Sequence, residues 1–150
     1  DDIAVRHVIG RRDFGEVSSR IPALPEGGLV YQAVEYEERM HLLLDAADVA
    51  VTRAGGSVFE LMATGVPAVL VPLPIATRDH QAANAHAVAA TGGAVVVDDA
   101  DLDVDRLERE LDQLLADPER LARMGEAMRA AATVDAAERA ARLVEDVARG

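Results

Sequence analysis

The stretch from Val49 to Leu61 constrains the fold of this chain most, because a short apolar run breaks into small residues there and then restarts with helical spacing. This pattern predicts a strand, a glycine turn and the amino-terminal end of a helix. The first backbone N–H groups of a helix have no intrahelical partners and lie at the positive end of the helix dipole. An anion, typically a phosphate, is therefore a natural ligand at this junction.

The residue types around this turn suit a sugar that carries a phosphate. Gly55 and Gly56 would let an anion approach the backbone, and Ser57 would add a hydroxyl donor beside it. Glu60, one helical turn further on, is placed to accept hydrogen bonds from a sugar diol. The alternative is an ordinary turn between strand and helix, with Ser57 as the N-cap.

Composition narrows the class of protein. A chain of 150 residues with 50% apolar content matches one domain with a sizeable core. Its 27 acidic and 15 basic residues give a net charge of −12 without a basic cluster, which disfavours nucleic acid as a partner. The absence of cysteine removes disulfide scaffolds and thiolate metal sites and fits a reducing compartment. The chain starts at Asp1 without methionine and enters a strand almost at once, which suggests a piece of a longer protein.

Strand-like runs alternate with helical patterns along the chain, and the last third is helical. Strands are expected at 3–9, 29–34, 49–52, 68–71 and 94–97, and helices at 13–20, 36–47, 57–64, 79–90, 102–115, 118–132 and 135–149. Residues 49–52 are predicted to be buried on both faces. Asp13, Asp79 and Asp117 are expected N-caps, and Gly65 is expected to end its helix.

This alternation predicts an α/β fold with a Rossmann-like, doubly wound parallel sheet and a helical tail. Ligands of such sheets bind at the carboxyl ends of the strands. The segments 35–40, 53–60 and 72–84 each follow a strand, so they are expected to form one pocket at that edge. No stretch approaches the roughly 20 apolar residues of a membrane span, so any membrane contact is expected to be peripheral.

Three blocks of sequence resemble the carboxyl-terminal half of the MurG-type UDP-N-acetylglucosaminyltransferases. They are R-A-G-G-S-x-x-E-L-x-x-x-G-x-P from Arg53, V-P-L-P from Val71 and D-H-Q-x-x-N-A from Asp79. The resemblance runs from about Ile3 to the end of the chain. It implies the two-domain GT-B fold and transfer of N-acetylglucosamine from UDP-N-acetylglucosamine to the lipid-linked muramoyl-pentapeptide. It also implies a role in peptidoglycan and cell wall biogenesis, cell shape and cell division.

The resemblance also implies roles for individual residues. The glycine turn with Ser57 would face the UDP diphosphate, and Glu60 would bind the ribose hydroxyls. Gln81 matches the second of two glutamines that contact the hydroxyls of N-acetylglucosamine in the family. Glu37, through its backbone, and Met40 fall where the family holds the uracil.

Two positions depart from the pattern, and one role stays open. His80 replaces the first of the paired glutamines, and the spacing from Arg53 to Glu60 is one residue shorter than in the family. Arg53 would either neutralise the diphosphate or brace the loop. No metal ligand and no cofactor are expected.

The resemblance also shows which parts of the family are missing from residues 1–150. A first strand with its glycine-rich loop and the whole acceptor domain do not lie in this sequence, so the chain is expected to be the donor-binding half, with no catalytic residue of its own. The missing strand belongs between 3–9 and 49–52. A retained peptide, a neighbouring chain or direct pairing of the flanking strands is expected to close that gap.

Other functions remain open at this point. One is a related GT-B transferase with another acceptor or nucleotide sugar, and another is a nucleotide-binding module without catalysis. Motifs of the UDP-N-acetylglucosamine epimerases are absent, and no G-x-G-x-x-G follows the first strand, as a dinucleotide site would require. The expected partners are UDP-N-acetylglucosamine and, through the absent domain, the lipid-linked acceptor. The expected location is the cytoplasm, peripherally on the inner face of the cell membrane.

Overall fold

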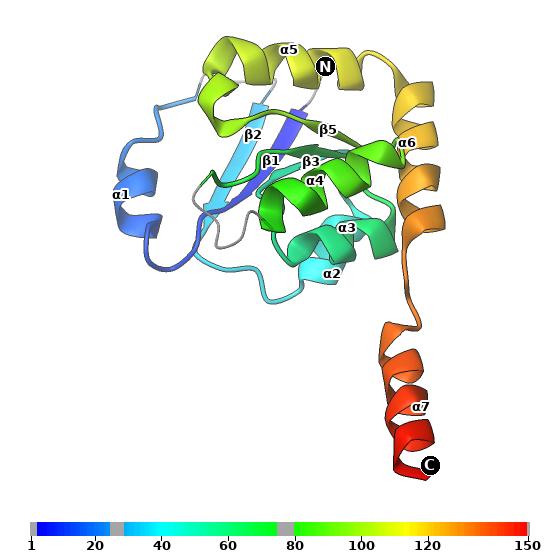
Figure 1. The fold of residues 1–150 in the computed structure, drawn as a ribbon. Helices are drawn as coiled ribbons and strands as arrows, with labels where there is room; N and C mark the ends of the chain where they lie inside the picture. Colours follow the sequence, from blue (N-terminus) through cyan, green and yellow to red (C-terminus); the bar gives the residue numbers. More distant parts are fainter. Residues whose placement is uncertain (1–2, 25–28, 75–79, 150) are drawn as a thin grey trace. The chain divides into compact units, whose positions relative to one another are not determined.

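A computed structural model describes residues 3–24, 29–74 and 80–149 of the chain, and Figure 1 labels most of its helices and strands. The chain divides into two compact units, residues 1–43 and 44–150, and each is described by itself. All strand pairings within these units are parallel, and helices alternate with the strands. The predicted α/β class is therefore confirmed.

Unit 1 is built on two parallel strands. β1 (Ile3–Val8) pairs with β2 (Leu29–Val34) in an unbroken register from Ile3 opposite Leu29 to Val8 opposite Val34. The helix α1 (Phe14–Ser19) lies between them in sequence. Both strands lie within a residue of their predicted bounds, because β-branched runs bounded by turn residues give a clear strand signal.

In the first half of the chain, the capping of α1 and the length of α2 differ from the prediction. Asp13 occupies the N-cap position of α1, but its side chain binds Arg12 and makes no capping hydrogen bond. The helix α2 (Met40–Asp45) is shorter than the predicted 36–47. The carboxylate of Glu37 accepts a hydrogen bond from the backbone N–H of Arg39 at 3.1 Å, and this local bond competes with helix formation.

Unit 2 contains a parallel sheet of three strands in the order β3-β4-β5. These strands are β3 (Ala50–Thr52), β4 (Ala68–Leu70) and β5 (Ala94–Val96). β4 is fully buried, but Val51 on β3 is 45% exposed. The prediction that 49–52 is buried on both faces is therefore wrong, because β3 is an edge strand of this sheet and pairs only with β4.

The described strands pair as two parallel sheets, β1-β2 within unit 1 and β3-β4-β5 within unit 2. Which of the three expected ways closes the gap between 3–9 and 49–52 stays a prediction.

Five α-helices and one 3₁₀-helix are described in unit 2 after β3. They are α3 (Ser57–Thr64), α4 (His80–Ala90), η2 (Asp99–Asp101), α5 (Val104–Leu115), α6 (Pro118–Ala131) and α7 (Ala136–Arg149). Gly65 ends α3 with a left-handed φ of 76°, and the Asp117 side chain accepts from the N–H of Arg120 at 2.8 Å, so both predicted caps are confirmed. The predicted cap at Asp79 lies outside the described residues. α5 begins two residues later than predicted, because Asp103 caps it through the N–H of Arg106.

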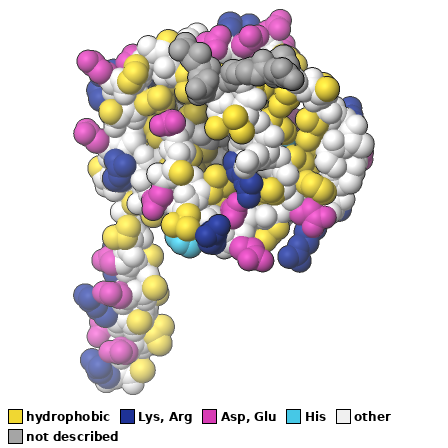
Figure 2. All heavy atoms as spheres, turned by 180° about the vertical axis from the view of Figure 1, so that it is seen from behind, with side chains coloured by type: hydrophobic (Ala, Val, Ile, Leu, Met, Phe, Trp, Pro, Cys, Tyr) yellow, Lys and Arg dark blue, Asp and Glu magenta, His cyan; other side chains and the backbone are white. Residues whose placement is uncertain are grey.

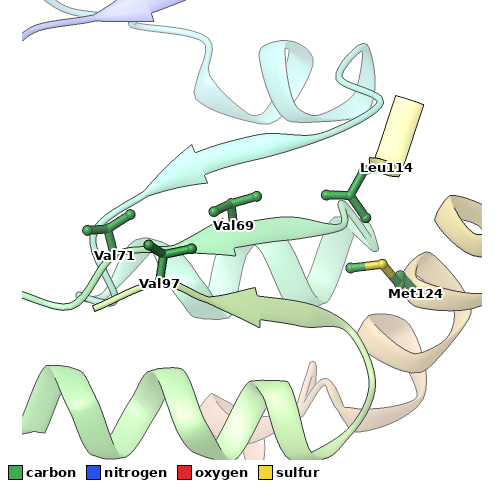
Figure 3. Close-up of a cluster of buried hydrophobic side chains, with 5 residues drawn as sticks. All are labelled: Val69, Val71, Val97, Leu114 and Met124. Carbon is green, nitrogen blue, oxygen red and sulfur yellow. The ribbon is translucent and has the colours of Figure 1, made fainter. Parts of the chain in front are cut away.

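One part of the core of unit 2 lies between its sheet and the helices α5 and α6. Five buried side chains form one cluster there, as Figure 3 shows: Val69, Val71, Val97, Leu114 and Met124. On another side of α6, a Cβ added to Gly125 would lie 2.7 Å from the carbonyl oxygen of Gly65. The carboxyl-terminal end of α3 and the helix α6 therefore pack against each other at close range.

The last helix, α7, has no buried residue. Its Leu143, Val144 and Val147 are each at least 65% exposed. Figure 2 shows hydrophobic side chains next to acidic and basic ones on its surface, as expected for a solvated face. Among the described residues, no helix is long and apolar enough to cross a lipid bilayer.

Candidate functional site

The glycine turn lies between the end of β3 and the start of α3, as the sequence predicts. Ala54 is fully buried, whereas Gly56 and Ser57 are exposed. Gly56 is the N-cap of α3, with no side-chain cap, and Ser57 is the first helical residue. The alternative in which Ser57 serves as the N-cap is therefore wrong, and its hydroxyl makes no hydrogen bond within the described part of the chain.

The fold itself does not require glycine at positions 55 and 56. Neither Gly55 nor Gly56 has a positive φ, and a Cβ added to either would meet no atom within 4 Å. By contrast, Gly65 has a positive φ and Gly125 faces backbone at close range. The two turn glycines therefore leave open backbone at the amino-terminal end of a helix, where an anion binds well.

Glu60 lies in the first turn of α3 and is exposed. Its carboxylate makes no hydrogen bond or ion pair with any residue that the structure describes. Its backbone carbonyl accepts from the Thr64 hydroxyl at 2.9 Å, so the helix turn is in place while the carboxylate stays open. A carboxylate with open lone pairs can accept two hydrogen bonds from a diol.

Arg53 directly precedes the glycine turn, and its side chain is 46% exposed. Its Nη1 donates to the carbonyl oxygen of Val71 at 3.2 Å and forms an ion pair with the carboxylate of Asp99. Of the two roles left open by the sequence, the structure shows the bracing contact. Asp99 was not among the predicted site residues, because it lies 46 positions away in sequence and outside the three motif blocks.

The start of α4 is tied to the loop after β4 and to the glycine turn. The backbone N–H of Leu73 donates to Oε1 of Gln81 at 3.0 Å. The side-chain amide of Asn84 donates to the carbonyl oxygen of Ala54 at 3.3 Å. His80 is the first residue of α4 and is exposed. The last two predicted segments, 53–60 and 72–84, are therefore in contact in unit 2 through Asn84, while residues 75–79 lie outside the described residues.

Asn84 holds the glycine turn in position, although it was not among the predicted site residues. It belongs to the D-H-Q-x-x-N-A block, so the motif itself carried the signal. Its amide donates to a carbonyl in the buried part of the turn, and a short polar side chain at that helical position is what this bond requires.

The first predicted segment, 35–40, lies in unit 1 after β2. It borders a hollow of about 380 Å³ lined by Arg11, Glu35, Tyr36, Glu37, Glu38 and Arg39. The Arg11 guanidinium lies 5.3 Å from the centre of the Tyr36 ring. Met40 begins α2 and is half-buried, and it does not line this hollow.

Glu37 is held by charge as well as by the backbone. Its carboxylate forms an ion pair with Arg6 at 2.7 Å and accepts the N–H of Arg39. The hydrogen bond from Arg6, followed by that from Arg39, lowers the pKa of the Glu37 carboxyl below its ordinary value. The side chain of Glu37 is thus occupied, and binding of a ligand through its backbone stays a prediction.

A second hollow, of about 430 Å³, lies in unit 2 near the amino-terminal end of β5. It is lined by the end of α4, the start of β5 and the first turns of α6, with Arg120 and Arg123 at its border. None of the predicted site residues lines it. Within the described ranges, no group of three or more His, Cys, Asp or Glu side chains is placed to hold a metal ion.

Comparison with known proteins gives a consistent result. Residues 1–140 match the family described as the glycosyltransferase family 28 C-terminal domain. A relative from a Nocardioides species is 46% identical over 130 residues, which are 86% of this chain and 35% of the relative. A relative from Alkalilimnicola ehrlichii is 41% identical over 146 residues, which are 97% of this chain and 40% of the relative. Both are named UDP-N-acetylglucosamine–N-acetylmuramyl-(pentapeptide) pyrophosphoryl-undecaprenol N-acetylglucosamine transferase.

Solved structures agree with these relatives. The crystal structure of Acinetobacter baumannii MurG superposes with a TM-score of 0.86 at 29% identity, covering 97% of this chain and 42% of that one. The glycosyltransferase VinC, in complex with dTDP, superposes with a TM-score of 0.70 at 25% identity, covering 99% and 35%. The chain thus spans well under half of the length of each of these proteins.

Proposed function

Since the chain belongs to the glycosyltransferase family 28 C-terminal domain family, we propose that it is the donor-binding part of an N-acetylglucosaminyltransferase. The donor is UDP-N-acetylglucosamine, and the acceptor is the lipid-linked muramoyl-pentapeptide of peptidoglycan synthesis. Support comes from the names of the relatives, which are 41% and 46% identical to this chain. The acceptor site, the catalytic residues and the contact with the inner face of the membrane belong to the remainder of such an enzyme.

One observation carries this proposal: the turn at Gly55 and Gly56 is open although the fold would accept a side chain at both positions. Ser57 and Glu60 follow it on the same helix, and neither the Ser57 hydroxyl nor the Glu60 carboxylate has a hydrogen-bond partner among the residues that the structure describes. A phosphate at the turn and a ribose diol at Glu60 would satisfy donors and acceptors that have no partner in the described part of the chain.

The remaining candidate residues keep their predicted roles in this proposal. The Oε1 atom of Gln81 is used by the N–H of Leu73, so its amide N–H groups are left to donate to a sugar hydroxyl. His80, the neighbouring residue, is exposed at the helix start and adds a second polar group for the sugar. Glu37, through its backbone, and Met40 would hold the uracil.

The experiment titrates the natural full-length protein with UDP-N-acetylglucosamine, UDP-glucose, UDP and dTDP. Calorimetry measures the affinity for each ligand. We expect UDP-N-acetylglucosamine to bind more tightly than UDP-glucose, and the protein to transfer the sugar to a lipid-linked acceptor. Equal affinity for both sugars would contradict the proposed donor. Absence of any binding to UDP would contradict a nucleotide-sugar site altogether.

A second candidate is a related transferase that uses another nucleotide sugar. His80 in place of a glutamine and the similarity to VinC, which was crystallised with dTDP, favour it. Tighter binding of dTDP than of UDP in the same titration would support this candidate over the first.

A further inference from the structure

The Arg53 side chain links the carboxyl ends of all three strands of the unit 2 sheet. Arg53 itself follows β3, Val71 follows β4, and Asp99 lies three residues beyond the end of β5. Nη1 of Arg53 donates to the Val71 carbonyl oxygen and pairs with the Asp99 carboxylate. One guanidinium nitrogen therefore fastens the edge of the sheet at which ligands of parallel α/β folds bind.

Only one edge of the guanidinium is used by these contacts. The group has five N–H donors, two on each Nη and one on Nε. Both of these partners bind Nη1, and Nε and Nη2 make no hydrogen bond to any residue described in the structure. The Nε and Nη2 donors form a fork that matches a phosphate or carboxylate with two parallel bonds. Arg53 can therefore brace the loop and bind an anion at the same time.

We propose that Asp99 is a positioning residue for Arg53, which it holds so that the free edge of the guanidinium is presented to a diphosphate at the glycine turn. This inference rests on the proposed donor-binding function. The side chains of Arg53 and Asp99 are 46% and 36% exposed, and ion pairs at such exposure add little to stability. The value of this pair lies in orientation, because a long arginine side chain otherwise samples many rotamers.

The test compares affinities for UDP, which carries the diphosphate, and for uridine, which lacks it, in the natural full-length protein. The variants are Asp99→Ala, Asp99→Asn, Arg53→Ala and the Asp99→Ala/Arg53→Ala double variant. Asp101→Ala is the matched control, because Asp101 lies on the same 3₁₀-helix and its carboxylate makes no hydrogen bond or ion pair with the described residues. Thermal unfolding without ligand reports any loss of folding.

We expect Asp99→Ala to weaken UDP binding roughly tenfold, the effect of losing a charge-assisted hydrogen bond, while uridine binding stays unchanged. Asp99→Asn should recover part of this loss, since its amide oxygen still accepts from Nη1. Asp101→Ala should bind UDP as the parent protein does. In the Arg53→Ala background, Asp99→Ala should have no further effect.

Several results would overturn the proposal. Equal losses for UDP and uridine would mean that Asp99 acts only on folding. Tighter UDP binding by Asp99→Asn would mean that the carboxylate repels the diphosphate, and additive losses would mean that Asp99 and Arg53 act independently. If the parent protein binds UDP and Asp99→Ala binds it with the same affinity, this inference is wrong but the proposed function stands. A parent protein that does not bind UDP removes the proposed function with it.

Discussion

The backbone N–H of Leu73 donates to Oε1 of Gln81 at 3.0 Å, so the loop after β4 is tied to the first turn of α4. A backbone N–H can only donate, and therefore the oxygen of the Gln81 amide, not its nitrogen, faces the loop. The two N–H groups of that amide make no hydrogen bond to the residues described. Gln81 thus combines a structural acceptor with donors that remain available to a ligand.

From this division we predict that Gln81 binds the sugar and not the nucleotide. Gln81→Ala should weaken binding of UDP-N-acetylglucosamine while plain UDP binds almost unchanged, and calorimetry measures both. Gln81→Glu keeps an acceptor for Leu73 but loses the donors, so it should also lower the affinity for the sugar nucleotide relative to UDP. Equal losses for the two ligands would place the start of α4 away from the sugar.

We predict that Glu60 is the main anchor of the ribose. Its carboxylate is exposed and makes no hydrogen bond or ion pair with a described residue, so Glu60→Ala should leave the unfolding free energy nearly unchanged. Hydrogen bonds to a charged group contribute roughly 1.5–3 kcal/mol, so the affinity for UDP should fall about tenfold or more. The measurement is a UDP titration of the natural full-length protein.

A ligand variant sharpens the Glu60 test. The parent protein should prefer UDP over 2′-deoxy-UDP, and Glu60→Ala should lose that preference. Glu126→Ala, a change at another exposed helical glutamate without a described partner, should bind both ligands as the parent does. A UDP affinity within about twofold of the parent in Glu60→Ala would rule out the assigned role.

The sequence predicted the elements of this fold well where the signal is local. The strand at Leu29–Val34 and the helix at Ser57–Thr64 have their predicted bounds, since β-branched runs and a terminal glycine are read from neighbouring residues. The burial of β3 was mispredicted, because an apolar run of Val49 to Thr52 does not reveal whether the strand lies at an edge of its sheet.

Residues that act over long separations were not accessible to the sequence. The pairing of Arg53 with Asp99 spans 46 positions and follows no periodic pattern. The shortening of α2 depends on a side-chain bond from Glu37 to the backbone of Arg39, which propensity alone does not weigh. The motif blocks selected the glycine turn, Glu60 and Gln81, but their roles toward a ligand stay predictions.

We predict that the Glu37 carboxyl titrates below its ordinary range because Arg6 donates to it. A pKa that is lower in the folded than in the unfolded chain stabilises the fold above the unfolded-state pKa, and this contribution is lost as the pH falls through the folded pKa. Arg6→Met should raise the pKa of Glu37, though the N–H of Arg39 still lowers it. An NMR titration of the Glu37 side chain measures this.

The acid dependence of unfolding provides the control for Glu37. Glu37→Gln should remove the part of the acid-induced loss of stability that comes from this carboxyl. When Arg6→Met is added to Glu37→Gln, the dependence of the unfolding free energy on pH should therefore not change further. An unchanged Glu37 titration in Arg6→Met would mean that the ion pair at 2.7 Å does not persist in solution.

The last prediction compares a glycine that packs against backbone, Gly125, with a glycine that faces open space, Gly55. An alanine at Gly125 would place its Cβ 2.7 Å from the carbonyl oxygen of Gly65, and backbone cannot move aside as a flexible side chain can. Gly125→Ala should therefore lower the unfolding free energy by about 1–3 kcal/mol, the usual effect of overpacking, although alanine favours the helix by up to about 1 kcal/mol. Urea unfolding measures this change.

Gly55→Ala should not destabilise the fold, because the added Cβ meets no atom within 4 Å and Gly55 has no positive φ. Its unfolding free energy should stay within about 0.5 kcal/mol of the parent, as for most exposed substitutions. The same Cβ would stand where an anion approaches the backbone, so UDP binding should weaken while uridine binding is retained. Unchanged UDP affinity in Gly55→Ala would show that the open turn does not serve the diphosphate, whatever the stability of Gly125→Ala.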